Sequence, residues 1–198
     1  MIASENGDLN RVREQLEKGV DVNARSDSGH TALMLAALAG HLEVVRDLLN
    51  AKADPNIRAY TFHGGEFLTL MAAMNRCNKN WDKILDVMIA AGGELNPKTV
   101  FSSSPLTYAI THYDPVLVKA LIERGADVNL KNEVGATPLM TAVMSRGATV
   151  EIIKLLLAAG ADANARDNEG KTALEFVDIY VKEKTERAQL THLLRKHR

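Results

Sequence analysis

One short motif recurs along the chain at a nearly constant spacing, and it constrains the fold more than any other feature. The segment Ala-Asp-x-Asn, or a near relative of it, occurs five times and ends at Asn23, Asn56, Asn96, Asn129 and Asn164. The intervals between these asparagines are 33, 40, 33 and 35 residues. A repeat of this length indicates an array of small supersecondary units, each of which buries its apolar surface against its neighbours.

Each copy contains two helical segments ahead of the motif. The later segment has apolar residues at i, i+1, i+4 and i+5, as in Val44, Val45, Leu48 and Leu49, and this spacing forms one face of an α-helix. The earlier segment is shorter and is centred on small residues, which allow two antiparallel helices to approach closely. In four copies the later segment is followed by a glycine, where helices commonly end in a left-handed residue; these are Gly19, Gly92, Gly125 and Gly160. The pattern predicts a helix–turn–helix–turn unit copied about six times.

These segments resemble the ankyrin repeat. Residues 29–33 (Gly-His-Thr-Ala-Leu) and 135–139 (Gly-Ala-Thr-Pro-Leu) match its opening, residues 40–45 match its inter-helix turn and residues 125–129 its closing turn. The resemblance covers essentially all 198 residues. It implies two antiparallel helices per repeat and a β-hairpin "finger" that projects from them. The expected fold is therefore all-α: an ankyrin-repeat solenoid of helix-turn-helix units with short β-hairpin fingers, in which the opening Thr caps the first helix.

We expect a single ankyrin-repeat domain over residues 1–198, with repeats at approximately 1–25 (a partial N-terminal cap), 26–58, 59–97 (with insertions), 98–131, 132–166 and 167–198 (a C-terminal cap). The third repeat has seven extra residues, of which three lengthen its finger and four lengthen the inter-helix turn at 76–81. Lys52 replaces a helix-ending glycine, at a cost of ~1 kcal/mol if that position is left-handed. The chain begins partway through the first helix of a repeat, so either a short cap is native or a leader has been trimmed. This leaves a cytoplasmic and a periplasmic or secreted location open.

Composition excludes several classes of function. The formal net charge is −1, whereas non-specific binding to nucleic acids requires an excess of basic residues. No apolar run is long enough to span a membrane. The chain has one cysteine, Cys77, so it has no internal disulfide and no multi-cysteine metal site. We expect no cofactor and no metal, because each Asp-x-Asn motif occupies the closing turn of its repeat.

Two alternative interpretations concern reactive or charged residues. Cys77 and His112 could form a thiol–imidazole pair, but we favour a position for Cys77 at the end of a helix, in an extended turn. His192 and His197 are expected to be solvated surface rather than metal ligands. Residues 182–198 carry six Lys or Arg and two Glu, and could contact an acidic partner. We favour a capping helix whose cations lie at its C-terminal end.

Seven of the nine aromatic residues fall between residues 60 and 113. We expect Phe67, Trp81 and Tyr108 to pack inside the array. We expect Tyr60, Phe62, Phe101 and Tyr113 to contact a partner. In the ankyrin family, partners bind the finger tips and the exposed side of each first helix. The corresponding partner-binding surface is Arg25, Asp27, His30, Leu38, Arg58, Tyr60, Phe62, His63, Glu66, Met74, Phe101, Thr111, His112, Tyr113, Lys131, Glu133, Met144, Arg166, Asn168 and Lys171.

The resemblance implies a non-catalytic, monomeric module that binds another folded protein on its finger tips and concave helical face. A more specific hypothesis is an inhibitor or immunity protein that occludes the cleft of an enzyme, because a long central finger suits entry into a cleft. One alternative is an adaptor or secreted effector that links two protein partners. The other is an enzyme that uses Cys77.

Overall fold

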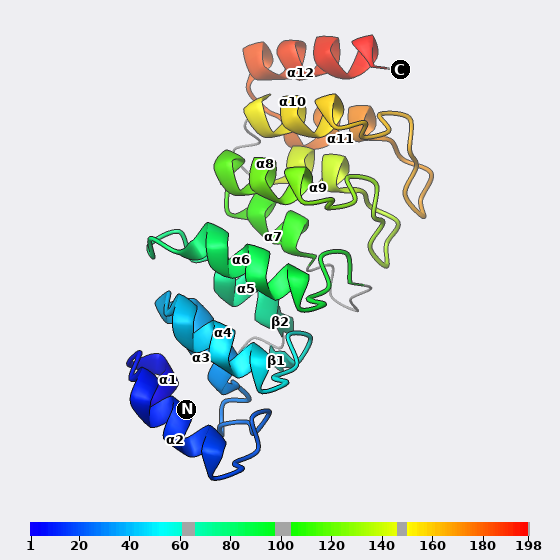
Figure 1. Cartoon of the computed structure of the whole chain (residues 1–198). Helices are drawn as coiled ribbons and strands as arrows, with labels where there is room; N and C mark the ends of the chain where they lie inside the picture. Colours follow the sequence, from blue (N-terminus) through cyan, green and yellow to red (C-terminus); the bar gives the residue numbers. More distant parts are fainter. Residues whose placement is uncertain (61–65, 98–103, 146–149, 198) are drawn as a thin grey trace. The chain divides into compact units, whose positions relative to one another are not determined.

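A computed structural model describes residues 1–60, 66–97, 104–145 and 150–197 of the chain (Figure 1). The chain forms two compact units, Met1–Leu95 and Asn96–Arg198. Within the described residues, no helix is long and apolar enough to cross a lipid bilayer.

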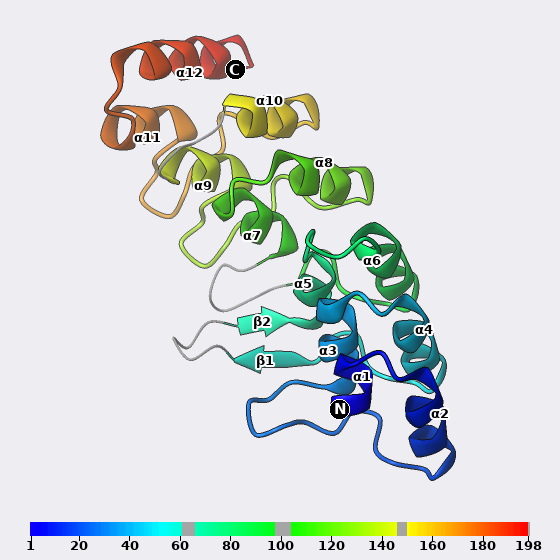
Figure 2. The same ribbon diagram turned by 90° about the vertical axis from the view of Figure 1, so that its left-hand side faces the viewer.

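The first unit consists of three consecutive helix pairs. They are α1 (Ile2–Glu5) with α2 (Leu9–Glu17), α3 (Ala32–Ala39) with α4 (Leu42–Asn50), and α5 (Thr69–Ala73) with α6 (Trp81–Ala90). The first helices α1, α3 and α5 pack in one row, and the second helices α2, α4 and α6 pack in another (Figure 2). This arrangement confirms the predicted pairing of a short first helix with an amphipathic second helix.

The second unit repeats this arrangement. It contains α7 (Pro105–Thr111) with α8 (Pro115–Glu123), α9 (Pro138–Met144) with α10 (Val150–Ala158), and α11 (Ala173–Tyr180) with α12 (Lys184–Lys196). Helix α9 packs between α7 and α11, α8 packs against α10, and α12 packs against α11.

Hydroxyl side chains cap the first helices α3, α7, α9 and α11, as the sequence predicts, whereas α1 and α5 have no side-chain cap. The Thr31 hydroxyl accepts a hydrogen bond from the Met34 N–H at 3.2 Å, and Thr137 and Ser104 accept equivalent bonds at the start of α9 and α7. Pro105 and Pro138 follow these caps in the first helical turn, where proline needs no backbone N–H. The capping hydroxyls are buried, so these hydrogen bonds also satisfy polar groups that water cannot reach.

The predicted apolar stripes of the second helices form the core of both units. In α4, α6, α8 and α10 the first three residues of each stripe are buried, and the fourth is half-buried in all but α10. The four glycines predicted to follow second helices, which come after α2, α6, α8 and α10, all have positive φ. Lys52, at the same position after α4, has φ 69°, so the left-handed conformation on which the expected cost depends is present.

The Asp-x-Asn motifs are structural turns that bridge neighbouring repeats. The Asn129 side chain donates to the Gly160 carbonyl oxygen at 3.1 Å and accepts from the Asp162 N–H at 2.8 Å. Asn56 and Asn96 make the same two bonds to the turns that follow them. The Asp carboxylate accepts from the backbone N–H of the Asn in its own motif, as Asp127 does from Asn129 at 2.8 Å. The predicted structural role of the motif is confirmed.

The third repeat carries the described β-structure. Strands β1 (Arg58–Tyr60) and β2 (Glu66–Leu68) pair antiparallel, with Ala59 opposite Phe67. We expected a β-hairpin in every finger, but in the three other described fingers, residues 24–31, 130–137 and 165–172, the arms form no strands. These three fingers have only two residues on each side of a four-residue turn, which is too short for a β-ladder. The finger of the third repeat is longer.

The insertion between α5 and α6 folds back onto the preceding repeat. The chain leaves α5 at Ala73 and enters α6 at Trp81, whereas α3 and α4 are separated by Gly40 and His41 alone. The Asn75 side chain donates to the Leu38 carbonyl oxygen at 3.0 Å, and the Asn80 side chain donates to the Gly40 carbonyl oxygen at 2.9 Å. The predicted lengthening of this turn is confirmed, and the added residues are tied to the structure.

Replacing Lys52 by Gly should raise the free energy of unfolding by about 1 kcal/mol, because glycine adopts a left-handed conformation without steric cost. Urea denaturation would measure the change. The reciprocal variant Gly19→Lys is the control: Gly19 has φ 71° and open space around its missing Cβ, so it should lose a similar amount. Equal stabilities for wild type and Lys52→Gly would show that the left-handed conformation of Lys52 has no steric cost.

Truncation of the core stripe should be far more costly than truncation of the C-terminal surface. Leu121 and Leu156 are 0% exposed, so Leu121→Ala or Leu156→Ala should each lower the free energy of unfolding by roughly 2–5 kcal/mol. The exposed Lys196 serves as the control, and Lys196→Ala should change stability by less than about 0.5 kcal/mol. Comparable losses in urea denaturation for the two kinds of variant would contradict the helical register.

Candidate partner-binding surface

Three fingers end in the same hydrogen-bonded turn. In each, the N–H of the fourth residue donates to the carbonyl oxygen of the first, over 2.8 Å for Gly29 to Ser26, 2.9 Å for Gly135 to Asn132, and 3.0 Å for Gly170 to Asp167. Ser, Asn or Asp at the first position and Gly at the fourth are the residues that β-turns favour. The turn residues therefore define the finger tips locally, and the glycines adopt positive φ.

The side chain at the first turn position locks each tip further. The Asn132 side-chain oxygen accepts from the backbone N–H groups of Val134, at 3.1 Å, and Ala136, at 2.8 Å. The Asp167 carboxylate accepts from Glu169 and Lys171 in the same way, at 2.9 and 2.8 Å. A backbone that is held by several hydrogen bonds loses little conformational entropy when a partner binds to it.

Two fingers of the second unit are also joined to each other. The Asn168 backbone N–H donates to the Val134 carbonyl oxygen at 3.0 Å, and its side-chain amide donates to the Glu133 carbonyl oxygen at 2.8 Å. The Lys131 ammonium donates to the Arg166 carbonyl oxygen at 2.8 Å. The two fingers, residues 130–137 and 165–172, lie side by side (Figure 1), and we call them the finger pair.

Fingers in the first unit are joined by fewer bonds among the described residues. The Arg25 guanidinium donates to the Arg58 carbonyl oxygen at 3.1 Å, which is the counterpart of the bond from Lys131 to Arg166. The rings of His30 and Phe67 lie 6.4 Å apart at an angle of 57°. The first finger and the β1–β2 hairpin thus also lie side by side (Figure 2).

Exposed apolar groups mark the C-terminal ends of the first helices. Leu38 is exposed in the last turn of α3, and the exposed Met144 is the last residue of α9. Tyr113, after α7, is exposed and has φ 54°, a left-handed conformation that is costly for an aromatic residue. Beside it, the His112 ring stacks on Tyr108 with centroids 3.9 Å apart.

Charges on the finger pair are of both signs. The Lys171 ammonium lies 2.7 Å from the Glu169 carboxylate, and this hydrogen bond raises the pKa of Lys171 above its usual value. Lys131, Glu133 and Arg166 are exposed on the same two fingers. The finger pair can therefore form charge-assisted hydrogen bonds with carboxylate and cationic groups of a partner.

Most of the predicted binding residues are accessible, and we sort them by where the structure places them. His30, Arg58 and Lys171 are half-buried. Tyr60 and Glu66 pair through their backbones in the β-hairpin. Phe62, His63 and Phe101 lie outside the described residues. The exposed residues are Arg25, Asp27, Leu38, Thr111, His112, Tyr113, Lys131, Glu133, Met144, Arg166 and Asn168.

The assignment of Met74 to the exposed surface is wrong, because its side chain is only 4% exposed. Met74 follows the five-residue helix α5, where the inserted turn begins. Asn75 bonds to the preceding repeat and draws the chain inward at this point. Phe67, Trp81 and Tyr108, which we expected inside the array, are all half-buried.

Exposed apolar residues of the second unit outside the predicted surface include Val134, Ile179 and Tyr180. For Val134 a signal existed, because the equivalent residues of the other described turns are the polar Ser28 and Glu169. Ile179 and Tyr180 lie at the end of α11 and continue the apolar pattern of its buried residues, so the sequence gave no indication that they are exposed.

Cys77 belongs to the first unit, whereas His112, His192 and His197 belong to the second. Cys77 is exposed in the turn after α5, and the His112 Nδ1 atom lies 2.9 Å from the Tyr108 carbonyl oxygen. Within the described residues, no group of three or more His, Cys, Asp or Glu could hold a metal ion.

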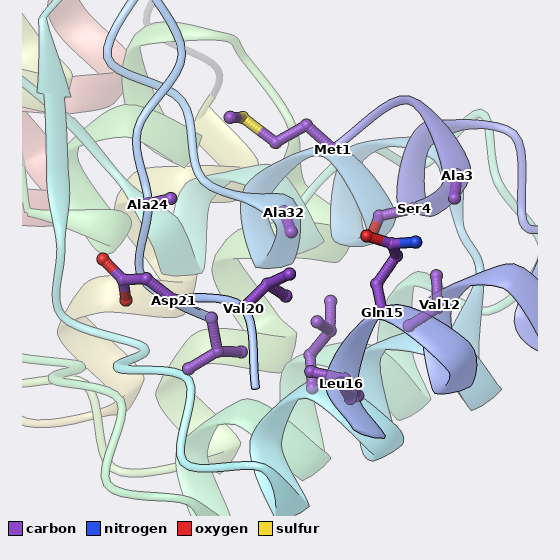
Figure 3. Close-up of a pocket in the computed structure, with 12 residues that line it drawn as sticks. Met1, Ala3, Ser4, Val12, Gln15, Leu16, Val20, Asp21, Ala24 and Ala32 are labelled. Atoms are coloured by element: carbon purple, nitrogen blue, oxygen red, sulfur yellow. The ribbon is translucent and has the colours of Figure 1, made fainter. Parts of the chain in front are cut away.

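A pocket of about 240 Å³ lies beside α1 and α2 in the first unit (Figure 3). Its walls are mostly aliphatic, with Val12 and Leu16 from α2 and Val20 beyond its end. Ser4 and Gln15 supply polar groups near one another in the view of Figure 3. The pocket contains none of the predicted partner-binding residues.

A pair of glycine variants should test the contact between the two fingers. Gly135 and Gly170 both have positive φ, but a Cβ at Gly135 would lie 2.7 Å from the Asn168 backbone N, whereas one at Gly170 would meet nothing within 4 Å. Gly135→Ala should therefore lower the free energy of unfolding by at least ~1 kcal/mol more than Gly170→Ala. Equal losses in urea denaturation would contradict the close approach of the fingers.

Comparison with known proteins agrees with this architecture. The family model for ankyrin repeats (3 copies) matches residues 1–59 and 70–167. The putative ankyrin repeat protein YahD of Escherichia coli is 32% identical over 179 residues, which cover 88% of this chain and 86% of YahD.

Solved structures show the same fold. An ankyrin repeat domain from Acinetobacter baumannii matches with a TM-score of 0.77 and 26% identity, covering 99% of this chain and 95% of that one. A chain in the complex of the predatory endopeptidase Bd0816 from Bdellovibrio bacteriovorus with the immunity protein Bd3460 matches with a TM-score of 0.71 and 23% identity, covering 99% and 96%. Repeated helix pairs, bridged closing turns and these matches together show that the chain belongs to the ankyrin-repeat family, a family of protein-interaction modules.

Proposed function

We propose that this protein is a non-catalytic monomer that binds one folded partner protein through its finger turns and the exposed ends of its first helices. The observation that carries the proposal is the finger pair, in which three hydrogen bonds join two fingers whose turns are already held by internal hydrogen bonds. Such a surface is rigid before it meets a partner, so binding costs little ordering. The exposed Leu38 and Met144 add apolar area of the kind that interfaces bury.

We further propose that the partner is an enzyme and that binding blocks its active cleft. Support comes from the likeness in fold to a complex that contains an immunity protein and an endopeptidase. The finger of residues 58–68 is lengthened relative to the other fingers, and a projecting segment suits entry into a cleft.

Affinity purification from the native organism tests this function. The full chain should recover one protein at a stoichiometric ratio, and that protein should lose its enzymatic activity when the purified chain is added. Recovery of several unrelated proteins would favour an adaptor instead. Recovery of one protein whose activity is unchanged would overturn the inhibitory role and leave the binding function intact.

Polar replacement of the exposed apolar helix ends should weaken the purified complex. Leu38→Ser with Met144→Ser should raise the Kd at least about tenfold and leave the melting temperature nearly unchanged, because neither side chain is in the core. Val116→Ser is the matched control: Val116 is 50% exposed, but it lies on the second helix α8. A Kd equal to that of the wild type, measured by titration calorimetry, would place the interface elsewhere.

A further inference from the structure

The pocket beside α1 and α2 contains a buried hydroxyl group without a hydrogen-bond partner. Ser4 belongs to α1, lines the pocket and is only 2% exposed. Among the residues that the structure describes, its hydroxyl neither donates nor accepts a hydrogen bond. A hydroxyl that leaves water without gaining a partner costs free energy, so buried hydroxyls are nearly always hydrogen-bonded. The partner of the Ser4 hydroxyl therefore has to come from within the pocket.

The fold itself does not need a hydroxyl at this position. Ser4 precedes Gly7 by three residues, as Ala37 precedes Gly40, and both glycines have positive φ. The equivalent residues of α3, α7 and α9 are apolar and buried, namely Ala37, Ile110 and Val143. The packing of a first helix is thus satisfied by an apolar side chain, and the serine is particular to the helix that borders the pocket.

A second polar group reaches the same pocket from α2. Gln15 is half-buried, and its side-chain amide also has no hydrogen-bond partner in the described part of the chain. Its amide lies near Ser4 in the view of Figure 3. Val12 and Leu16 of α2 are apolar neighbours of Gln15 in the pocket wall. The pocket therefore combines an aliphatic wall with two uncharged groups that can each donate and accept hydrogen bonds.

The volume and charge of the pocket restrict what can bind there. An apolar cavity of about 150 Å³ holds one benzene molecule, so about 240 Å³ has room for roughly eight to ten non-hydrogen atoms. No lining side chain is cationic, and Asp21 is the one acidic residue in the lining. An anionic head group would therefore lose water without gaining a counter-ion. Val20 and Met1 are 46% and 42% exposed, so the lining reaches solvent and leaves an entry path.

We propose that this pocket binds a small uncharged aliphatic molecule whose head group is a carboxamide or a hydroxyl. The head group bonds to the Ser4 hydroxyl and the Gln15 amide, and the aliphatic body lies against Val12 and Leu16. A carboxamide can donate to one of these two groups and accept from the other. The inference goes beyond the proposed function, because the pocket shares no residue with the proposed partner-binding surface.

The experiment titrates the full chain with hexanamide and follows the backbone amide signals by NMR. Hexanamide has an aliphatic body and an uncharged head, and its size is within the range set by the pocket. We expect saturable shifts confined to α1, α2 and residues 20–24, with a Kd of about 1 mM or below. Hexanoate and hexylammonium have the same chain with a charged head, and each should bind at least about tenfold more weakly.

Two variants test the assigned groups. Ser4→Ala removes only the hydroxyl and should raise the Kd for hexanamide about threefold to tenfold. Its melting temperature should equal or exceed that of the wild type, because the hydroxyl makes no hydrogen bond within the described residues. Gln15→Met keeps the length of the side chain without its amide and should weaken binding similarly. Gln189→Met, an exposed position on α12, is the matched control and should bind like the wild type.

Contrary results separate the parts of the proposal. Shifts that do not saturate, or that lie outside this pocket, overturn the site. Hexanoate binding as tightly as hexanamide overturns the uncharged head group, and tighter binding of hexylammonium assigns the head to Asp21 instead. Wild-type affinity in Ser4→Ala overturns the role of the hydroxyl. A lower melting temperature for Ser4→Ala assigns that hydroxyl to the fold and overturns the proposal. The proposed function is tested on other residues and stands or falls separately.

Discussion

The asparagine bridge between successive closing turns is the interaction on which each unit depends. One amide side chain donates to a carbonyl and accepts from an N–H of the next turn, as Asn129 does with Gly160 and Asp162. A primary amide supplies both functions at the right separation, whereas a carboxylate would leave the carbonyl without a donor. Each bridge follows the end of a second helix, so it sets the distance between consecutive second helices and brings their apolar stripes into contact.

The fingers begin directly after these bridged turns, and their position follows from the same bonds. Asn129 precedes the finger of residues 130–137, and Asn164 precedes the finger of residues 165–172. Because the bases of neighbouring fingers are held at a fixed spacing, short polar side chains such as Asn168 can join their tips. A surface built in this way is made of backbone turns, and its specificity comes from the few side chains that the turns display.

Sequence periodicity predicted the fold well because the repeat imposes the same local pattern several times. Thr31 at a helix start and Lys52 after a helix end could both be placed by comparison with other copies. Met74 could not, because its burial depends on hydrogen bonds from an insertion that no other copy contains. The exposure of most residues on the predicted surface could be anticipated, since turn and helix-end positions are local properties. Val134 was missed because hydrophobicity normally indicates the core, although Ser28 and Glu169 at the equivalent turn positions indicated an exposed site.

The insertion between α5 and α6 has a consequence for how the first unit can be taken apart. Asn75 and Asn80 donate to the Leu38 and Gly40 carbonyl oxygens, and the Asn78 side chain packs where a side chain on Gly40 would otherwise lie. Excision of the third repeat would therefore leave acceptors and an open surface on the second, and exchange with a repeat of ordinary length would do the same. The second and third repeats are therefore coupled through the insertion as well as through their packed helices.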